Sequence, residues 1–446
     1  MLEILRDGSW LTVARLRLIS LTVLAAAVLA IIALAVTSDG RNDYQGRPLG
    51  SDFSNIYAAG SYVLEGRAAK PFDWRSQHER EKEIFGADTP FYGWHYPPFF
   101  LFVAGALATM PYWLALILWQ TATLLLYLLS LHAILFPAAW SKPDSTHTKR
   151  AWRDRAPANF EDPFLVLSAL ASPLATARNN KLWLILALAF PAVFVNLGHG
   201  HNGFLTAALF GGALVLLDSR PVLAGFLFGF VAYKPQFGML IPLVLMISGR
   251  WAAFATTLAT FVWLIVITTL FFGTEVWWAF YSTLHLTQTQ VLEAGGTGWH
   301  KIQSVFAWMR MWGAGVSFAY TVQGAVSLGV CGVMILMWRS ETPYPLKAAA
   351  LMIGTLLATP YSLDYDMMLL APAIAYLAAY GLERGFAPWE KSALALLWFV
   401  PLITRTVAET ILMPLGCWMM LFMFILVTQR AMNDMSMPVR RASSAR

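Results

Sequence analysis

The sequence has little charge. Asp, Glu, Lys and Arg make up 13% of its 446 residues, 58% are hydrophobic, and the mean hydropathy is +0.57. Soluble domains are about a quarter charged, so this composition argues against a soluble protein. Apolar segments long enough to cross about 30 Å of hydrocarbon recur along the chain. The sequence therefore predicts an all-α, polytopic helical membrane protein that forms a single integral membrane domain over residues 1–446.

Cysteine is scarce as well. Cys331 and Cys417 both fall inside predicted spans and are interpreted as small apolar packing residues, which leaves a disulfide or a cysteine metal site with little support. The net charge of +6 is modest, and the basic residues gather near span ends, as the positive-inside rule expects of a protein among membrane lipids. This pattern argues against nucleic acid as a partner. We find no internal repeat.

The N-terminus predicts a retained first span. Arg6, Arg15 and Arg17 precede the apolar run 18–36, and no A-x-A-like cleavage site follows it. Several of the later spans are short and lie near Gly or Pro, which indicates broken or re-entrant helices around an intramembrane cavity. These spans are expected at about 113–135, 182–197, 203–217, 221–234, 236–248, 250–272, 317–338, 346–359, 367–381, 389–405 and 411–429.

Charge placement predicts which side each loop occupies. With a cytoplasmic N-terminus, the basic segments 142–181, 218–220, 248–250 and 382–384 all fall inside. The polar loops fall outside: 38–98, 198–202, 233–236, 273–316, 359–366 and 405–409. The number of spans stays open at about 12 if 96–135 crosses once, or about 14 if 96–113, 113–137 and 162–176 each cross. We expect a cell inner membrane protein whose site faces the periplasm.

Two polar segments are expected to lack regular structure. Residues 142–162 have the composition of a flexible connector, and residues 433–446 that of a disordered cytoplasmic tail.

The first extracytoplasmic loop, residues 38–98, is large for a loop directly after a first span. Asp52 precedes an apolar-faced helix, where Ser51 or Asp52 either caps the helix or, in the case of Asp52, acts as a general base. The spacing of Ser76 and Glu79 predicts a capping box for a second surface helix. His95 and Tyr96 lie in the run 94–98, Trp-His-Tyr-Pro-Pro, which is either an aromatic belt anchor or a stacking wall for a sugar or prenyl chain.

Further candidates lie between later spans. His199 and Asn202 sit in the glycine-containing loop 198–202, where they are placed to donate to a phosphate or hydroxyl; its two histidines at i and i+2 are a weak metal signal. Lys234 and Gln236 lie between two apolar segments, where the lysine either snorkels or meets an anion.

The outer loops near the C-terminal half add charged residues. His300 and Lys301 lie in the second extracytoplasmic loop, residues 273–316, which is long enough to fold over a site. Asp364 and Asp366 open a span, where acidic groups also satisfy a helix dipole. Arg405 is placed to pair with Glu409 or to serve the site.

These motifs together resemble glycosyltransferase family 87, a membrane family of the GT-C type. The resemblance rests on the order and spacing of short motifs over most of the chain. They are residues 51–53 with 57–60, 96–98 with 110–112 and 118–119, 196–199 with Asn202, 224–225 with 234–236, and 359–361 with 365–366. One departure is His199, which stands where the family pattern leads us to expect Gln.

The resemblance implies an inverting transfer of a hexose, mannose first among them, from a polyprenyl-phosphate sugar donor to a lipid or glycan acceptor at the non-cytoplasmic face. Asp52 would be the general base, and Lys234, His300, Lys301 and Arg405 would bind the donor phosphate. The remaining candidates, His95, Tyr96, His199, Asn202, Gln236, Asp364 and Asp366, would contact substrate. No cofactor and no metal is expected. The main rival is a transporter or flippase for a lipid-linked sugar, which would favour related halves and ionisable residues near span centres.

Overall fold

Helix makes up 77% of the computed structural model, which describes residues 2–137 and 182–436. In these two ranges the backbone forms no β-strand; two isolated bridges join Asn42 to Pro48 and Ile302 to Leu363. The prediction of an all-α polytopic membrane protein is confirmed.

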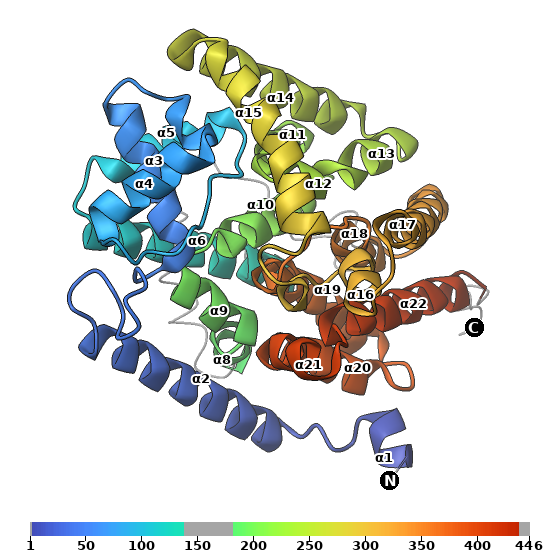
Figure 1. Ribbon diagram of the computed structural model, residues 1–446. Helices are drawn as coiled ribbons and strands as arrows, with labels where there is room; N and C mark the ends of the chain where they lie inside the picture. Colours follow the sequence, from blue (N-terminus) through green and yellow to red (C-terminus); the bar gives the residue numbers. More distant parts are fainter. Residues whose placement is uncertain (1, 138–181, 437–446) are drawn as a thin grey trace, which may run out of the picture.

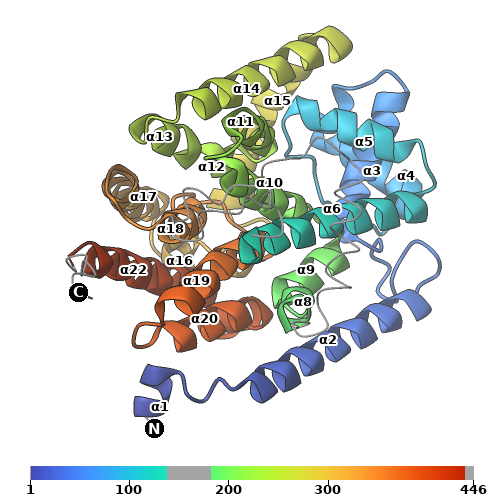
Figure 2. The same cartoon turned by 180° about the vertical axis from the view of Figure 1, so that it is seen from behind.

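The first described range holds the first span, the helices of the first loop and a second long helix. Its elements are α1 (Leu2–Asp7), α2 (Val13–Val36), α3 (Ser51–Leu64), η1 (Lys70–Phe72), α4 (Trp74–Phe85), η2 (Pro98–Phe100), α5 (Leu101–Ala108) and α6 (Tyr112–Leu135). After Arg15 and Arg17 near its start, α2 is apolar on all sides, and it buries only Ser20, which fits a helix surrounded by lipid. It lies along one edge of the molecule beside α8 and α9 (Figures 1 and 2).

The second range begins with a series of short helices interrupted by prolines. They are α8 (Leu182–Leu188), α9 (Pro191–His199), α10 (Gly203–Leu216), α11 (Pro221–Phe230), η6 (Val231–Tyr233), α12 (Pro235–Gly238) and α13 (Leu240–Ile247), followed by the long α14 (Trp251–Phe272). Proline lacks an N–H and favours the first turn of a helix, so each of Pro191, Pro221 and Pro235 opens a new helix. The predicted broken helices are therefore present.

The C-terminal part carries the second loop and the last long helices. Its elements are α15 (Glu275–Leu286), the π-helix η7 (Thr287–Glu293), η8 (Trp299–Lys301), α16 (Val305–Met311), α17 (Val316–Arg339), α18 (Tyr344–Leu357), η9 (Asp364–Leu369), α19 (Leu370–Arg384), α20 (Glu390–Phe399), η10 (Val400–Leu402), α21 (Thr404–Ile411) and α22 (Leu415–Ser436). α22 continues past the expected start of the tail at 433. Residues 437–446, the connector 142–162 and the optional span 162–176 lie outside the described residues.

Six helices of the described ranges are long and apolar enough to cross a membrane: α2, α6, α14, α17, η9 with α19, and α22. Two bent pairs also pass this test together, Leu182–Leu188 with Pro191–His199 at 45° and Glu390–Leu402 with Thr404–Ile411 at 73°. Five shorter apolar helices of 10–17 residues accompany them. The number of crossings stays a prediction.

Small residues set the packing of the short helices on the long ones. Gly225 and Gly229 of α11 are one turn apart and face α14. A Cβ added at Gly225 would lie 2.4 Å from the Ala253 carbonyl oxygen, and one added at Gly229 would lie 2.4 Å from Thr260 Cβ. In a membrane, close helix approach through small residues replaces the hydrophobic drive available in water. This packing holds α14 beside the broken helix that carries Lys234.

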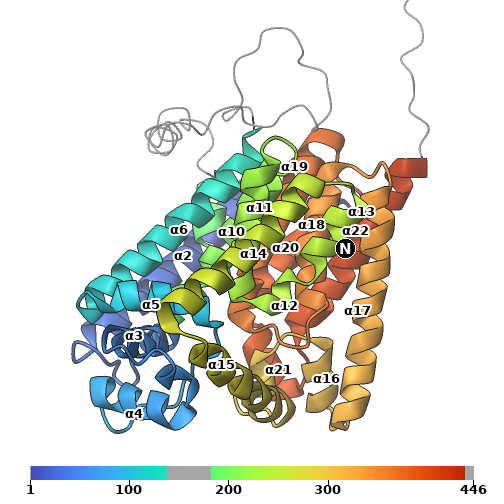
Figure 3. The same ribbon diagram turned by 90° about the horizontal axis from the view of Figure 1, so that it is seen from above.

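The two polar loops place their helices at the same end of the molecule. Figure 3 shows α3, α4, α15, α16 and α21 at the lower end of the long helices. The predicted capping residues of the first loop are wrong. The N-cap of α3 is Gly50 at φ 67°, with no side-chain cap, and the N-cap of α4 is Asp73, whose carboxylate accepts from the Arg75 N–H. Asp52 is therefore free of a capping role.

Candidate active site

Asp52 occupies the first turn of α3, at the end of the molecule that the two loops cover. The neighbouring Phe53 and Ile56 are fully buried, which fixes the turn, while the Asp52 side chain keeps 22% of its surface exposed. Burial raises the pKa of Asp52, and the charges of His199 and Lys301 lower it. This carboxylate is thus positioned by packing and remains accessible.

His199 ends α9 directly beside Asp52. Its Nδ1 shares a hydrogen bond with Ser51 Oγ at 2.8 Å and lies 4.0 Å from Asp52 Oδ2. Gly200 makes this approach possible. It has φ 66°, and an added Cβ would lie 2.5 Å from Phe53 Cβ. The turn after α9 therefore packs directly on the start of α3.

Lys234 and Asp366 form a buried ion pair at the break between η6 and α12. Lys234 Nζ donates to Asp366 Oδ1 at 2.5 Å, and the Leu363 N–H donates to Asp366 Oδ2 at 2.9 Å. The side chains are 5% and 1% exposed. An unpaired charge at this depth is costly, so each group is the counter-ion that keeps the other one charged.

Aromatic rings connect this ion pair to the His199 turn. The His201 ring stacks on Tyr365 with centroids 3.5 Å apart, and its Nε2 lies 3.4 Å from the Tyr96 hydroxyl. Lys234 Nζ lies 5.4 Å from the centre of the Tyr365 ring, a cation–π arrangement. The Tyr233 hydroxyl donates to the Asn202 carbonyl at 3.1 Å. Four chain segments are therefore held together.

The second loop is fastened to the segment that opens η9. The Gln303 N–H donates to the Ser362 carbonyl at 2.6 Å, and the Ser304 hydroxyl donates to the Pro360 carbonyl at 2.7 Å. The Thr404 hydroxyl donates to Gln303 Oε1 at 2.6 Å, which adds the start of α21 to the assembly.

This fastening brings three basic residues together. The electrostatic neighbours of Lys301 include Arg405, Asp364 and Asp52, and those of His300 include Arg405, Lys301 and Asp364. Arg405 Nη1 lies 3.8 Å from Asp364 Oδ2, so the ion pair of Arg405 is with Asp364 rather than with the expected Glu409. Burial lowers the pKa of both Lys301 and His300, and the adjacent cations add to this effect.

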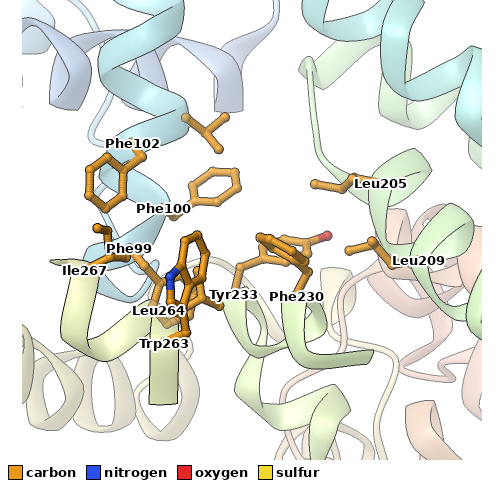
Figure 4. A pocket seen from close by; sticks show the side chains of 11 residues that line it. Phe99, Phe100, Phe102, Leu205, Leu209, Phe230, Tyr233, Trp263, Leu264 and Ile267 are labelled. Atoms are coloured by element: carbon orange, nitrogen blue, oxygen red, sulfur yellow. The ribbon is translucent and has the colours of Figure 1, made fainter. Parts of the chain in front are cut away.

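An apolar cavity of about 280 Å³ lies on the other side of Tyr233. Phe100 stacks on Tyr233 with centroids 5.3 Å apart, and Tyr96 packs on Phe100 at 4.7 Å, so aromatic rings separate the cavity from His201. Figure 4 shows that its walls come from η2 and α5, α10, α11 with η6, and α14. They are lined by Phe99, Phe100, Phe102, Val103, Leu205, Leu209, Phe230, Tyr233, Trp263, Leu264 and Ile267.

The family model for glycosyltransferase family 87 matches residues 94–360, more than half of the chain. The chain belongs to glycosyltransferase family 87. Comparisons with curated proteins and with solved structures gave no match. The matched range includes Lys234, His199 and Lys301, whereas Asp52, Asp366 and Arg405 lie outside it.

Most residues predicted for this family 87 site converge in space. Asp52, His199, Lys234, Lys301, Asp364, Asp366 and Arg405 form one group of ion pairs and electrostatic neighbours. His300 and Tyr96 border this group, and Asn202 joins it through its backbone carbonyl.

Two of the predicted residues stand apart from this group. His95 Nδ1 shares a hydrogen bond of 2.9 Å with Thr287 Oγ1, and burial lowers the pKa of His95 to about 4, so it is a neutral link between the two loops. Gln236 is half-buried in α12, and in residues 2–137 and 182–436 no hydrogen bond joins it to the other candidates.

Sequence reasoning predicted Tyr96 but missed two other aromatic members of the candidate site, Tyr233 and Tyr365. Tyr365 lies between the two predicted carboxylates, and Tyr233 directly precedes the predicted lysine. Their position inside the motifs was the available signal. Within the described part of the chain, His, Cys, Asp and Glu form no group of three or more that could hold a metal ion.

Proposed function

We propose that this family 87 protein transfers a hexose, mannose being the first to test, from a polyprenyl-phosphate donor to a lipid or glycan acceptor, with inversion. The reaction takes place at the periplasmic face of the inner membrane. One observation carries the proposal: the half-buried carboxylate of Asp52, which does not cap its helix, has the cation Lys301 as an electrostatic neighbour. An apolar cavity lies in the same group of helices.

Asp52 is the proposed general base. It takes the proton from the acceptor hydroxyl as that oxygen bonds to C1 of the sugar, while the bond between C1 and the phosphate oxygen breaks. The polyprenyl phosphate leaves with the electron pair of that bond. Phosphate is a good leaving group, so the scheme requires no general acid.

Lys301 and Arg405, with His300, are the proposed ligands of the donor phosphate. Lys301 is half-buried, and the Arg405 side chain is 38% exposed, at a loose 3.8 Å from Asp364. Lys234 is already neutralised by Asp366 at 2.5 Å, which makes it a weaker candidate for phosphate than the sequence predicts. We assign Lys234 to holding the segment that opens η9 in place.

The apolar cavity is the proposed place for the first isoprene units of the donor. Its lining is almost entirely hydrocarbon and aromatic, and Tyr233 at its inner wall directly precedes Lys234. Apolar concave sites with polar groups at one end are typical of amphiphilic ligands.

The test is transfer by purified protein in liposomes that contain polyprenyl-phosphate mannose and a lipid acceptor. Wild type is expected to form glycosylated product, and Asp52→Asn to lose at least about 100-fold in rate because its amide cannot accept a proton. Asp88→Asn, an exposed carboxylate of the same loop, is the matched control and should retain full activity. Unchanged transfer by Asp52→Asn would overturn the assigned base. Movement of the labelled donor between leaflets without product would favour the transporter instead.

A further inference from the structure

His199 lies between Asp52 and solvent, a position that suits a further role besides the proposed contact with substrate. Its side chain is 32% exposed, so it contacts solvent, while its Nδ1 faces both Ser51 Oγ at 2.8 Å and Asp52 Oδ2 at 4.0 Å. A proton that leaves Asp52 through His199 therefore has a route to water.

The two helix ends favour a charged pair at this place. His199 is the last residue of α9, where the partial negative charge of the helix C-terminus stabilises a cation. Asp52 lies in the first turn of α3, where the partial positive charge of the N-terminus stabilises an anion. Transfer of a proton from Asp52 to His199 thus creates charges that both helices stabilise.

We propose that His199 is the positioning residue that takes the proton from Asp52 after each transfer and so returns the base to its ionised form. The inference rests on the proposed function for the origin of that proton. The O–H bond of the neutral Asp52 carboxyl breaks, an N–H bond forms on the neutral imidazole, and the imidazolium then releases its proton to water. No oxidant or further reactant is needed.

Other titratable groups surround the pair and belong to the same balance. Besides burial, charged residues of the second loop, of η9 and of the segment before α12 shift the pKa of Asp52. Burial lowers the pKa of His201 in the next turn of the chain, and the charge of His199 lowers it further. These groups are Lys301, Asp364, Lys234, Glu81, Tyr92, Tyr96, Tyr361, Tyr365 and His201. Their charges shift the pH at which the pair exchanges its proton.

The pH dependence of turnover tests the role. The imidazole must be neutral to accept the proton, so wild-type kcat should rise as the pH is raised from about 6 to 7.5. His199→Gln retains a hydrogen-bond acceptor for Ser51 but cannot take the proton. We expect its kcat near pH 7.5 to fall about 10- to 100-fold with unchanged donor KM, and the rise near neutral pH to disappear. Added imidazole should restore part of the rate of His199→Ala.

Two outcomes would overturn the role. A His199→Gln variant with wild-type kcat and pH profile would make the contact merely structural. A wild-type rate that falls as pH rises from 6 to 7.5 would show that the cationic form is required instead.

A second measurement needs no transfer and so separates this inference from the proposed function. The pKa of the His199 imidazole is followed by NMR in the full-length protein, its signal assigned with His199→Gln. Asp52→Asn should lower that pKa, because the imidazolium loses the charge 4.0 Å away. An unchanged pKa would sink the coupling even if transfer is confirmed.

Discussion

Lys234 and Asp366 lie 132 positions apart in the sequence and are joined by a 2.5 Å contact in a buried part of the molecule. The lysine lies at a break between two short helices, and the carboxylate belongs to the 3₁₀ helix η9, which precedes α19. Both segments interrupt regular helix in a buried part of the molecule, where backbone groups outside the helix need partners within the protein. The ion pair holds these two irregular segments against each other.

We predict that the pair is worth more to the fold than either member alone. Lys234→Met leaves Asp366 buried without its cation and is expected to destabilise the protein by about 3–5 kcal/mol. Adding Asp366→Asn removes the stranded charge while keeping an acceptor for the Leu363 N–H, so the double variant should recover part of the loss. Thermal unfolding in detergent measures the cycle. Additive losses would contradict the coupling, and a stable double variant with a raised donor KM would restore Lys234 as a phosphate ligand.

The turn after α9 offers a matched pair of glycines. Gly200→Ala should disturb the site because the residue has φ 66° and the new Cβ would meet Phe53 Cβ at 2.5 Å. The combined strain and overlap are expected to cost about 1–3 kcal/mol and to move His199 away from Asp52. Gly198→Ala is the control, because nothing lies within 4 Å of its added Cβ. Unfolding temperatures and transfer rates should separate the two variants; equal behaviour would contradict the close approach.

The burial of Glu81 predicts that the first loop loses stability at alkaline pH. Its side chain is fully buried in α4 and accepts from the Tyr92 N–H at 3.3 Å, and in the described ranges no salt bridge reaches it. Burial raises the pKa of Glu81 to about 8, far above the 4.5 of an ordinary glutamate. The folded state therefore keeps a proton that the unfolded state loses.

It follows that the contribution of Glu81 to the stability of the loop is largest below pH 4.5, falls between pH 4.5 and 8, and stays low above this range. Glu81→Gln should flatten this dependence and make the loop more stable than wild type at pH 9. Hydrogen exchange or limited proteolysis of residues 74–94 at pH 6 and pH 9 reports it. A variant with the same pH dependence as wild type would show that Glu81 is not the cause.

The apolar cavity predicts a dependence on donor chain length. Leu209→Trp narrows it, so the KM for a long polyprenyl-phosphate donor should rise about tenfold, while a donor with a very short chain should be used as by wild type. Leu270→Trp on α14 is the control, because Leu270 is 75% exposed and outside the cavity lining. An equal loss with both donors would place the effect on folding rather than on the prenyl chain.

The periodic features of the sequence predicted the helices well, whereas the local contacts were less accessible. Apolar runs interrupted by Pro191, Pro221 and Pro235 predict broken helices because proline restricts the backbone wherever it stands. The cap of α3 was missed because Gly50 acts through a left-handed conformation rather than through a side chain. The same limit applies to Arg405, since its partner Asp364 comes from a distant segment that only the fold brings near.

The structure also changes the roles that the sequence motifs suggest for Lys234 and His95. A lysine between two spans predicts an anion nearby but does not say whether that anion is a substrate or the protein's own carboxylate. Lys234 forms its ion pair with Asp366, and the accessible cations are instead Lys301 of the second loop and Arg405, its neighbour in α21. His95 reads as a substrate contact in the sequence, yet its bond to Thr287 joins two loops.

The fastening of Gln303 to Ser362 and to Thr404 has a consequence for biosynthesis. Arg405 joins the candidate site only after α21 has left the ribosome and reached its place beside the second loop. Any nascent or truncated chain that ends before this helix lacks Arg405 and the Gln303–Thr404 bond. The order of synthesis thus delays completion of the candidate site until nearly the whole protein has been inserted.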